Sequence, residues 1–92
     1  MQGDLLIVFV DSKCAINLEV QRRVERRAVN LPGGCDLKMA FAPSASHSAL
    51  HERLSIIELP AVVFLKDGVE KERCSSIDDV LEFVSEIVLR YK

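Results

Sequence analysis

The chain has 92 residues, of which 49% are hydrophobic, and its 12 basic residues nearly balance its 14 acidic residues. This size and apolar content predict a single domain, residues 1–92, that buries a core without disulfides or metals. The net charge of −2 gives no general attraction to nucleic acid or to an anionic membrane surface. No apolar segment approaches the roughly 20 residues that cross a bilayer, and none is typical of a signal peptide, so a cytoplasmic location is expected.

The first half of the chain predicts two strands and a helix. Apolar β-forming residues fill Leu5–Val10, which is typical of a strand that is covered on both faces. Ala15–Val29 has apolar residues at helical spacing with charged residues between them, and it predicts an amphipathic helix. Asn30–Gly34 (NLPGG) predicts a turn, and the alternating pattern of Cys35–Ala42 predicts a second strand.

The second half predicts a short helix, a hairpin and a closing helix. Pro43–Ile56 begins with helix-starting residues. After Pro60 come an apolar strand, a turn at Asp67-Gly68 and a more polar strand, which together are typical of a β-hairpin. Ser76 is the N-cap expected for a closing amphipathic helix. The order β-α-β-α-β-β-α predicts an α/β fold with a four-stranded sheet and helices on both faces.

The element order and two landmarks resemble the thioredoxin-like superfamily over nearly the whole chain. In that family a central strand ends a few residues before a nucleophilic cysteine at a helix start, as IVFVDSKC does around Cys14. A proline, usually cis, precedes the third strand of the family, and Pro60 in ELPAVVFLKDG matches it. The resemblance implies the mixed sheet of that fold and a cis bond between Leu59 and Pro60.

The family's functional motif is only half present. Thioredoxins have Trp-Cys-Gly-Pro-Cys where this chain has residues 13–17, KCAIN, so the aromatic residue and the second cysteine are missing. A buried acidic residue that assists proton transfer in many members would fall near Val8, which cannot do that work. The resemblance therefore implies an altered active site.

Cys14 is the candidate nucleophile, because a helix N-terminus favours negative charge and therefore the thiolate. With Asn17 in place of the second cysteine, an external thiol such as glutathione would have to release a mixed disulfide at Cys14. This pattern resembles one-cysteine glutaredoxin-like proteins, although their Gly-Gly before an acidic pair becomes Ser75-Ser76 here. The alternative is an inert cysteine inherited from a redox ancestor.

The resemblance also implies a binding groove. In the family, the backbone before the cis-proline pairs with an extended substrate like an added strand. Leu59 and Pro60 are therefore candidate substrate-binding residues, together with Ile16 and Asn17 beside Cys14. Two functions stay open: thiol–disulfide exchange or redox sensing on a protein or peptide substrate, and a redox-inactive adaptor that binds proteins in this groove. No bound cofactor is expected for either.

The sequence gives weaker evidence of function for the remaining cysteines and for the histidines. Cys74 aligns within one residue of a family glycine beside the cis-proline, so it is a candidate to attack a mixed disulfide at Cys14. The alternative is a small apolar residue of the sheet. Cys35 is expected to be structural, at the end of the sheet away from Cys14. His47 and His51 have metal-binding spacing but no third ligand, so a solvated helical face is expected.

Four arginines lie close together on the first predicted helix, at positions 22, 23, 26 and 27. Such a cluster could meet an acidic partner. Glu19 and Glu25 share that face of the helix, which favours a solvated surface instead.

Overall fold

The computed structural model describes residues 3–29 and 35–91. Its elements are β1 (Asp4–Val10), α1 (Ala15–Ala28), β2 (Leu37–Pro43), α2 (Ser48–Arg53), β3 (Ala61–Lys66), β4 (Val69–Cys74) and α3 (Val80–Leu89). This is the order that the sequence predicts. The turn predicted at residues 30–34 lies outside the described residues. None of the described helices is long and apolar enough to span a membrane.

The four strands form one mixed sheet in the order β2-β1-β3-β4. β1 is parallel to β2, to which the crossover through α1 connects it, and antiparallel to β3. β3 and β4 form the predicted hairpin, and its turn residues Asp67 and Gly68 have positive φ values of 52° and 84°. Two successive positive φ values are typical of a type I′ turn, which suits the twist of paired strands. The four-stranded mixed sheet predicted from the sequence is confirmed.

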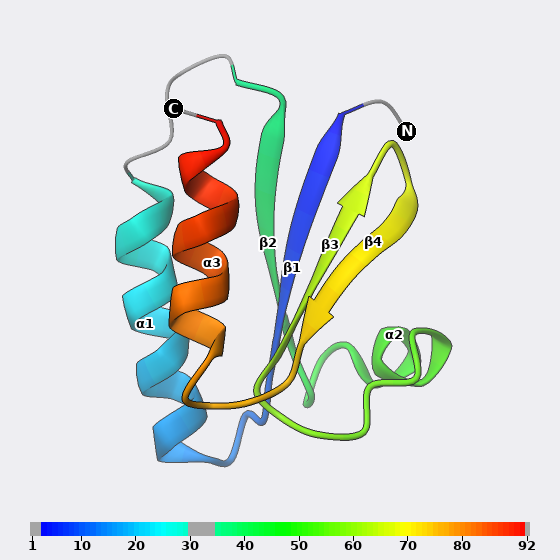
Figure 1. Cartoon of the computed structure of the whole chain (residues 1–92). Coiled ribbons are helices and arrows are strands. Elements are labelled where there is room, and N and C mark those ends of the chain that lie inside the picture. Colours follow the sequence, from blue (N-terminus) through cyan, green and yellow to red (C-terminus); the bar gives the residue numbers. More distant parts are fainter. Residues whose placement is uncertain (1–2, 30–34, 92) are drawn as a thin grey trace.

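Helices cover both faces of the sheet. Figure 1 shows α1 and α3 side by side on one face, with α2 on the other side near the end where β1 meets α1. Successive β1 side chains alternate between these faces: Leu6, Val8 and Val10 join the core with α1 and α3, whereas Ile7 and Phe9 join the core with α2. Because both faces of β1 are buried, its sequence is a continuous apolar run.

The closing helix begins later than the sequence predicts. Ser76 is not its N-cap, because α3 starts at Val80 and Asp79 occupies the cap position. The backbone carbonyl of Ser76 accepts hydrogen bonds from the N–H groups of Asp79 and Val80, at 3.1 and 2.9 Å. A turn held by backbone bonds therefore precedes the regular helix, in place of a cap made by the Ser76 hydroxyl.

Candidate functional site around Cys14

Cys14 lies between β1 and α1, at the N-cap position of α1, with an extended backbone of φ −106° and ψ 115°. Its N–H donates to the carbonyl of Asp11, and its carbonyl accepts from the N–H of Leu18, both at 3.1 Å. The half-buried side chain makes no capping hydrogen bond. The thiol is therefore held at a helix end whose first-turn N–H groups favour a negative charge.

Asn17 stands where a second cysteine would be, and only 4% of it is exposed. Its Oδ1 accepts from the backbone N–H of Asp11 at 3.0 Å, and its Nδ2 donates to the Sγ of Cys14 at 3.3 Å. A backbone N–H can only donate, so Oδ1 must face Asp11 and Nδ2 must face the sulfur. The side chain is turned inward because both ends of its amide are bonded within the site. Contact between Asn17 and a substrate stays an untested prediction.

A second loop supports the loop that carries Cys14. The N–H of Ser12 donates to Oγ of Ser44 at 3.1 Å, and the N–H of Ala45 donates back to Oγ of Ser12 at 3.0 Å. Oδ1 of Asp11 also accepts from the N–H of Lys13 at 2.9 Å. Sequence reasoning missed these residues. Their signal is that serine and aspartate follow the first strand and serine follows the second, where parallel strands end side by side.

The peptide bond between Leu59 and Pro60 is cis, the form that the sequence predicts. Pro60 is buried, and the half-buried Leu59 packs its side chain against the core shared with α2. Substrate binding at Leu59 and Pro60 stays an untested prediction. Within the described residues, neither the N–H nor the C=O of Leu59 makes a backbone hydrogen bond, which leaves both groups free to pair with an extended peptide.

Exposed isoleucines lie at the start of α1, in the segment that leads to Pro60 and in the segment before α3. Ile16, which follows Cys14 closely in the chain, is 60% exposed, Ile77 is 40% exposed and Ile57 is 91% exposed. Ile16 and Ile77 line one groove between α1 and the start of α3. Ile57 lines a second groove, between the segment that leads to Pro60 and β4. Sequence reasoning found Ile16 but missed Ile57 and Ile77, because their exposure depends on how the loops fold.

Cys74 ends β4 opposite Val62 and packs against the core between the sheet and the helices α1 and α3. Pro60 precedes Val62 by two residues, so continued antiparallel pairing would set Ser76, rather than Cys74, level with Pro60. Cys14 is not among the residues that line the groove at Cys74. These contacts favour a small apolar role for Cys74. Attack on a disulfide at Cys14 stays an untested prediction.

Cys35 lies before β2, which begins at Leu37 rather than at the predicted Cys35. The Sγ of Cys35 donates to the carbonyl of Leu37 at 3.6 Å, and its side chain packs against the core. These contacts agree with the structural role expected from the sequence. Cys14, Cys35 and Cys74 are all free thiols in the structure.

The two histidines differ from expectation in one respect. His47 is exposed, but His51 is only 9% exposed, so the prediction that both lie on a solvated face is wrong for His51. Nε2 of His51 lies 2.8 Å from the carbonyl of Ala42, and its ring stands edge-on to Phe9 with 4.9 Å between centroids. His51 therefore faces β1 as a core residue. In the part of the chain that the structure describes, no group of three or more His, Cys, Asp or Glu side chains could hold a metal ion.

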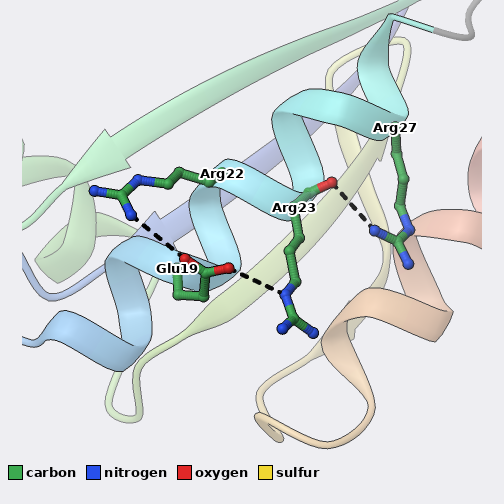
Figure 2. Close-up of polar contacts among 4 residues, drawn as sticks. All are labelled: Glu19, Arg22, Arg23 and Arg27. Atoms are coloured by element: carbon green, nitrogen blue, oxygen red, sulfur yellow. Dashed lines mark hydrogen bonds and ion pairs between the residues drawn. The ribbon is translucent and has the colours of Figure 1, made fainter.

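Figure 2 shows the polar contacts of Arg22, Arg23 and Arg27 on α1. Arg22 and Arg23 both pair with Glu19, at 3.4 and 3.3 Å, and all three side chains are well exposed to solvent. Arg27 differs, because its Nε donates to Oγ of Ser85 on α3 at 2.8 Å and its Nη1 donates to the carbonyl of Arg23 at 3.1 Å. Exposed ion pairs contribute little stability. The cluster is thus a solvated surface with one residue, Arg27, that joins two helices.

Known structures identify the fold. No protein-family model matches the chain, and no curated protein matches it. Thioredoxin from Fasciola hepatica is similar with a TM-score of 0.80 and 23% identity, over 99% of this chain and 84% of that one. Oxidised thioredoxin O2 from Arabidopsis thaliana gives 0.77 and 18%, over 99% and 77%. The N-terminal domain of SasA from Synechococcus elongatus gives 0.72 and 20%, over 99% and 84%. The chain therefore has a thioredoxin-like fold, as the resemblance in its sequence implies.

Proposed function

We propose that this chain carries out thiol–disulfide exchange on a protein or peptide substrate through one reactive cysteine, Cys14. The observation that carries the proposal is the environment of its sulfur. Cys14 occupies the N-cap of α1 without a capping hydrogen bond, and its Sγ accepts a hydrogen bond from the buried amide of Asn17. Both features favour the thiolate, which is the form that attacks a disulfide.

The reaction needs no second cysteine in the chain. The Cys14 thiolate attacks one sulfur of a substrate disulfide, forms a Cys14–substrate disulfide and releases the other substrate sulfur as a thiolate. A glutathione thiolate then attacks the substrate sulfur of this mixed disulfide, and Cys14 leaves as a thiolate again. Glutathione is thus an external reactant rather than a bound cofactor. A reducing compartment such as the cytoplasm would supply it, and free thiols at all three cysteines fit such a compartment.

Phe9 pairs with Ala61, so the segment before β3 lies at the end of the sheet where β1 leads to Cys14. This end of the sheet suits an extended, partly apolar peptide. The free backbone groups of Leu59 can pair with such a peptide as an added strand pairs with a sheet edge. Ile16 and Ile57 expose apolar surface that can receive its side chains. The substrate proposed here is therefore a protein segment or peptide that carries a disulfide next to apolar residues.

The test is treatment of the fully reduced protein with oxidised glutathione, followed by intact and peptide mass spectrometry. We expect one glutathione per chain, attached to Cys14, that persists until a reducing thiol is added. Cys35 is the control within the same molecule, because it is a half-buried free thiol away from a helix N-terminus. Absence of modification at Cys14, or equal modification of Cys14 and Cys35, would contradict the proposal.

A redox-inactive adaptor is the second candidate function. The free backbone of Leu59 and the exposed isoleucines favour it, because neither depends on the thiol. A thioredoxin-like fold does not by itself decide between exchange and binding. The replacement Cys14→Ser separates the two: an adaptor retains binding of its peptide partners, whereas the exchange proposed here is abolished.

A further inference from the structure

We infer that Asn17 is a positioning residue for the exchange at Cys14, whose amide holds the sulfur and donates a hydrogen bond to its thiolate. The inference rests on the proposed function, because it concerns the same sulfur. Asn17 lies one helical turn after Cys14, and this spacing brings its side chain against the sulfur. The position that a second cysteine would occupy is therefore filled by a hydrogen-bond donor.

The orientation of the amide is fixed by its other partner. Asn17 is 4% exposed, so water cannot readily replace its bonds, and its Oδ1 is held by the N–H of Asp11 at 3.0 Å. If the amide were flipped, its NH₂ group would face the Asp11 N–H, and two donors would oppose each other in a buried site. The bond from Asp11 thus keeps the Nδ2 donor aimed at Sγ of Cys14.

This donor acts mainly on the ionised sulfur. A thiol or disulfide sulfur is a weak acceptor, whereas a hydrogen bond to a charged group is about twice as strong as a neutral one. The Asn17 donor therefore stabilises Cys14 when it is a thiolate, before its attack and again when it leaves the mixed disulfide. It contributes little while Cys14 is bound to substrate. Asn17 thus assists release by an external thiol, although its own side chain cannot attack a disulfide.

Two replacements separate this role from a merely structural one. Asn17→Asp keeps an oxygen facing the Asp11 N–H and places a second oxygen, in place of the donor, beside the sulfur. Asn17→Ala removes both contacts without adding a charge. Each variant is compared with the wild type by the alkylation rate of Cys14 with iodoacetamide at one neutral pH, measured by peptide mass spectrometry. The thiolate fraction is measured at the same pH from the ultraviolet absorbance lost on alkylation.

We expect both replacements to slow the alkylation of Cys14 roughly threefold, because each removes the hydrogen-bond donor that faces its attacking sulfur. The thiolate fraction should fall by more than the alkylation rate, since a less stabilised thiolate is also a stronger nucleophile. The rate at Cys35 should not change. Slow hydrogen exchange at the Asp11 amide in Asn17→Asp, as in the wild type, shows that the loop is intact.

Two outcomes would overturn the inference alone. Wild-type thiolate fraction and alkylation in Asn17→Asp would mean that Asn17 only shapes the loop. Loss in Asn17→Asp but not in Asn17→Ala would mean that added charge, rather than the missing donor, slows the reaction. The proposed function fails separately, if Cys14 of the wild type reacts no faster than Cys35.

Discussion

The guanidinium of Arg73 on β4 donates to the backbone carbonyl of Leu54 at 2.9 Å, and the same group pairs with Glu70 at 2.7 Å. This arrangement ties the edge strand of the sheet to the segment that leads to Leu59. Leu54 is followed by Ser55, whose φ of 54° marks a sharp change of direction. The backbone proposed to pair with a peptide is therefore held in part from the sheet edge.

Loss of the Arg73 side-chain contacts should loosen this segment. The amides of Ser55 and Ile56 donate to backbone carbonyls at 3.0 and 2.8 Å, so their hydrogen exchange reports local opening. In Arg73→Met we expect exchange at both amides to accelerate about two- to tenfold, which corresponds to the loss of one exposed hydrogen bond worth about 0.5 to 1.4 kcal/mol. Lys71→Met, an exposed change on the same strand, is the matched control. Equal exchange in the two variants would show that Arg73 does not hold the segment.

The same contact predicts a dependence on pH. The hydrogen bond from Arg73 lowers the pKa of Glu70 below its ordinary value of 4.5. A carboxyl group whose pKa is lower in the folded state stabilises the fold above its unfolded pKa, and this contribution is lost as pH falls through the folded value. The pair is exposed, so global stability should change by less than about 1 kcal/mol. Protection of the Ser55 amide, corrected for intrinsic exchange, should fall on acidification in the wild type and stay constant in Glu70→Gln.

Cys14 should react with iodoacetamide faster than Cys35 at neutral pH. The Cys14 sulfur accepts a hydrogen bond and lies at a helix N-terminus, whereas the Cys35 sulfur donates to a carbonyl and packs against the core. The helix end and the amide donor together predict a rate difference of roughly tenfold. Timed alkylation followed by peptide mass spectrometry measures both rates in one sample. Similar slow rates at the two cysteines would remove the case for a reactive thiol.

A buried pair at the other end of β1 gives a prediction about stability. The Tyr91 hydroxyl donates to the carboxylate of Asp4, a residue that is only 7% exposed. Burial and this bond raise the pKa of the Tyr91 phenol above its ordinary value of 10.0. Tyr91→Phe leaves the buried carboxylate without this donor and should lower the free energy of unfolding by about 1–3 kcal/mol. Urea titration at neutral pH measures the change.

The neighbouring Arg90 provides the control for that measurement. It forms an exposed ion pair with Glu72 at 2.6 Å, so Arg90→Met should change the free energy of unfolding by less than about 1 kcal/mol. An effect of Tyr91→Phe no larger than that of Arg90→Met would show that the buried bond to Asp4 contributes nothing beyond a surface contact.

The sequence predicts most of the fold because the signals for its elements are local. The apolar run of β1 is typical of a buried strand, and the Asp67-Gly68 pair is typical of a hairpin turn, so neighbouring residues alone indicate each element. Ser76 misleads because a backbone turn satisfies the same N–H groups as a side-chain cap. His51 misleads for a different reason: its burial depends on Phe9, which lies far from it in the chain. Such contacts exist only after the sheet and α2 are placed.

The residues of the candidate site can likewise be predicted only in part from the sequence. Cys14 is recognisable because a strand leads to a cysteine at a helix start, and the resemblance points to Pro60. The inward orientation of Asn17 is not visible in the sequence, because it depends on the single backbone N–H of Asp11. The exposure of Ile57 depends likewise on the path of the loop before Pro60. Residue types therefore identify where the site lies, and the loops decide which groups face the solvent.

The last prediction concerns Cys74 as a partner for Cys14. A disulfide needs Cα atoms within roughly 7 Å and side chains that face each other. The Cys74 side chain packs against the core. Continued strand pairing would place Ser76, two residues after Cys74, opposite Pro60. We therefore expect no link between Cys14 and Cys74 when the reduced monomer is oxidised and its disulfides are mapped by peptide mass spectrometry.

The same packing predicts the kinetics of release. Glutathione bound at Cys14 should leave at the same rate in the wild type and in Cys74→Ser, because release depends on the external thiol alone. Cys35→Ser is the matched control, since it removes another half-buried thiol. Faster release in the wild type than in Cys74→Ser, together with a mapped Cys14–Cys74 disulfide, would show that Cys74 replaces the cysteine missing at Asn17. Equal rates would leave Cys14 as a single thiol that needs an external reductant.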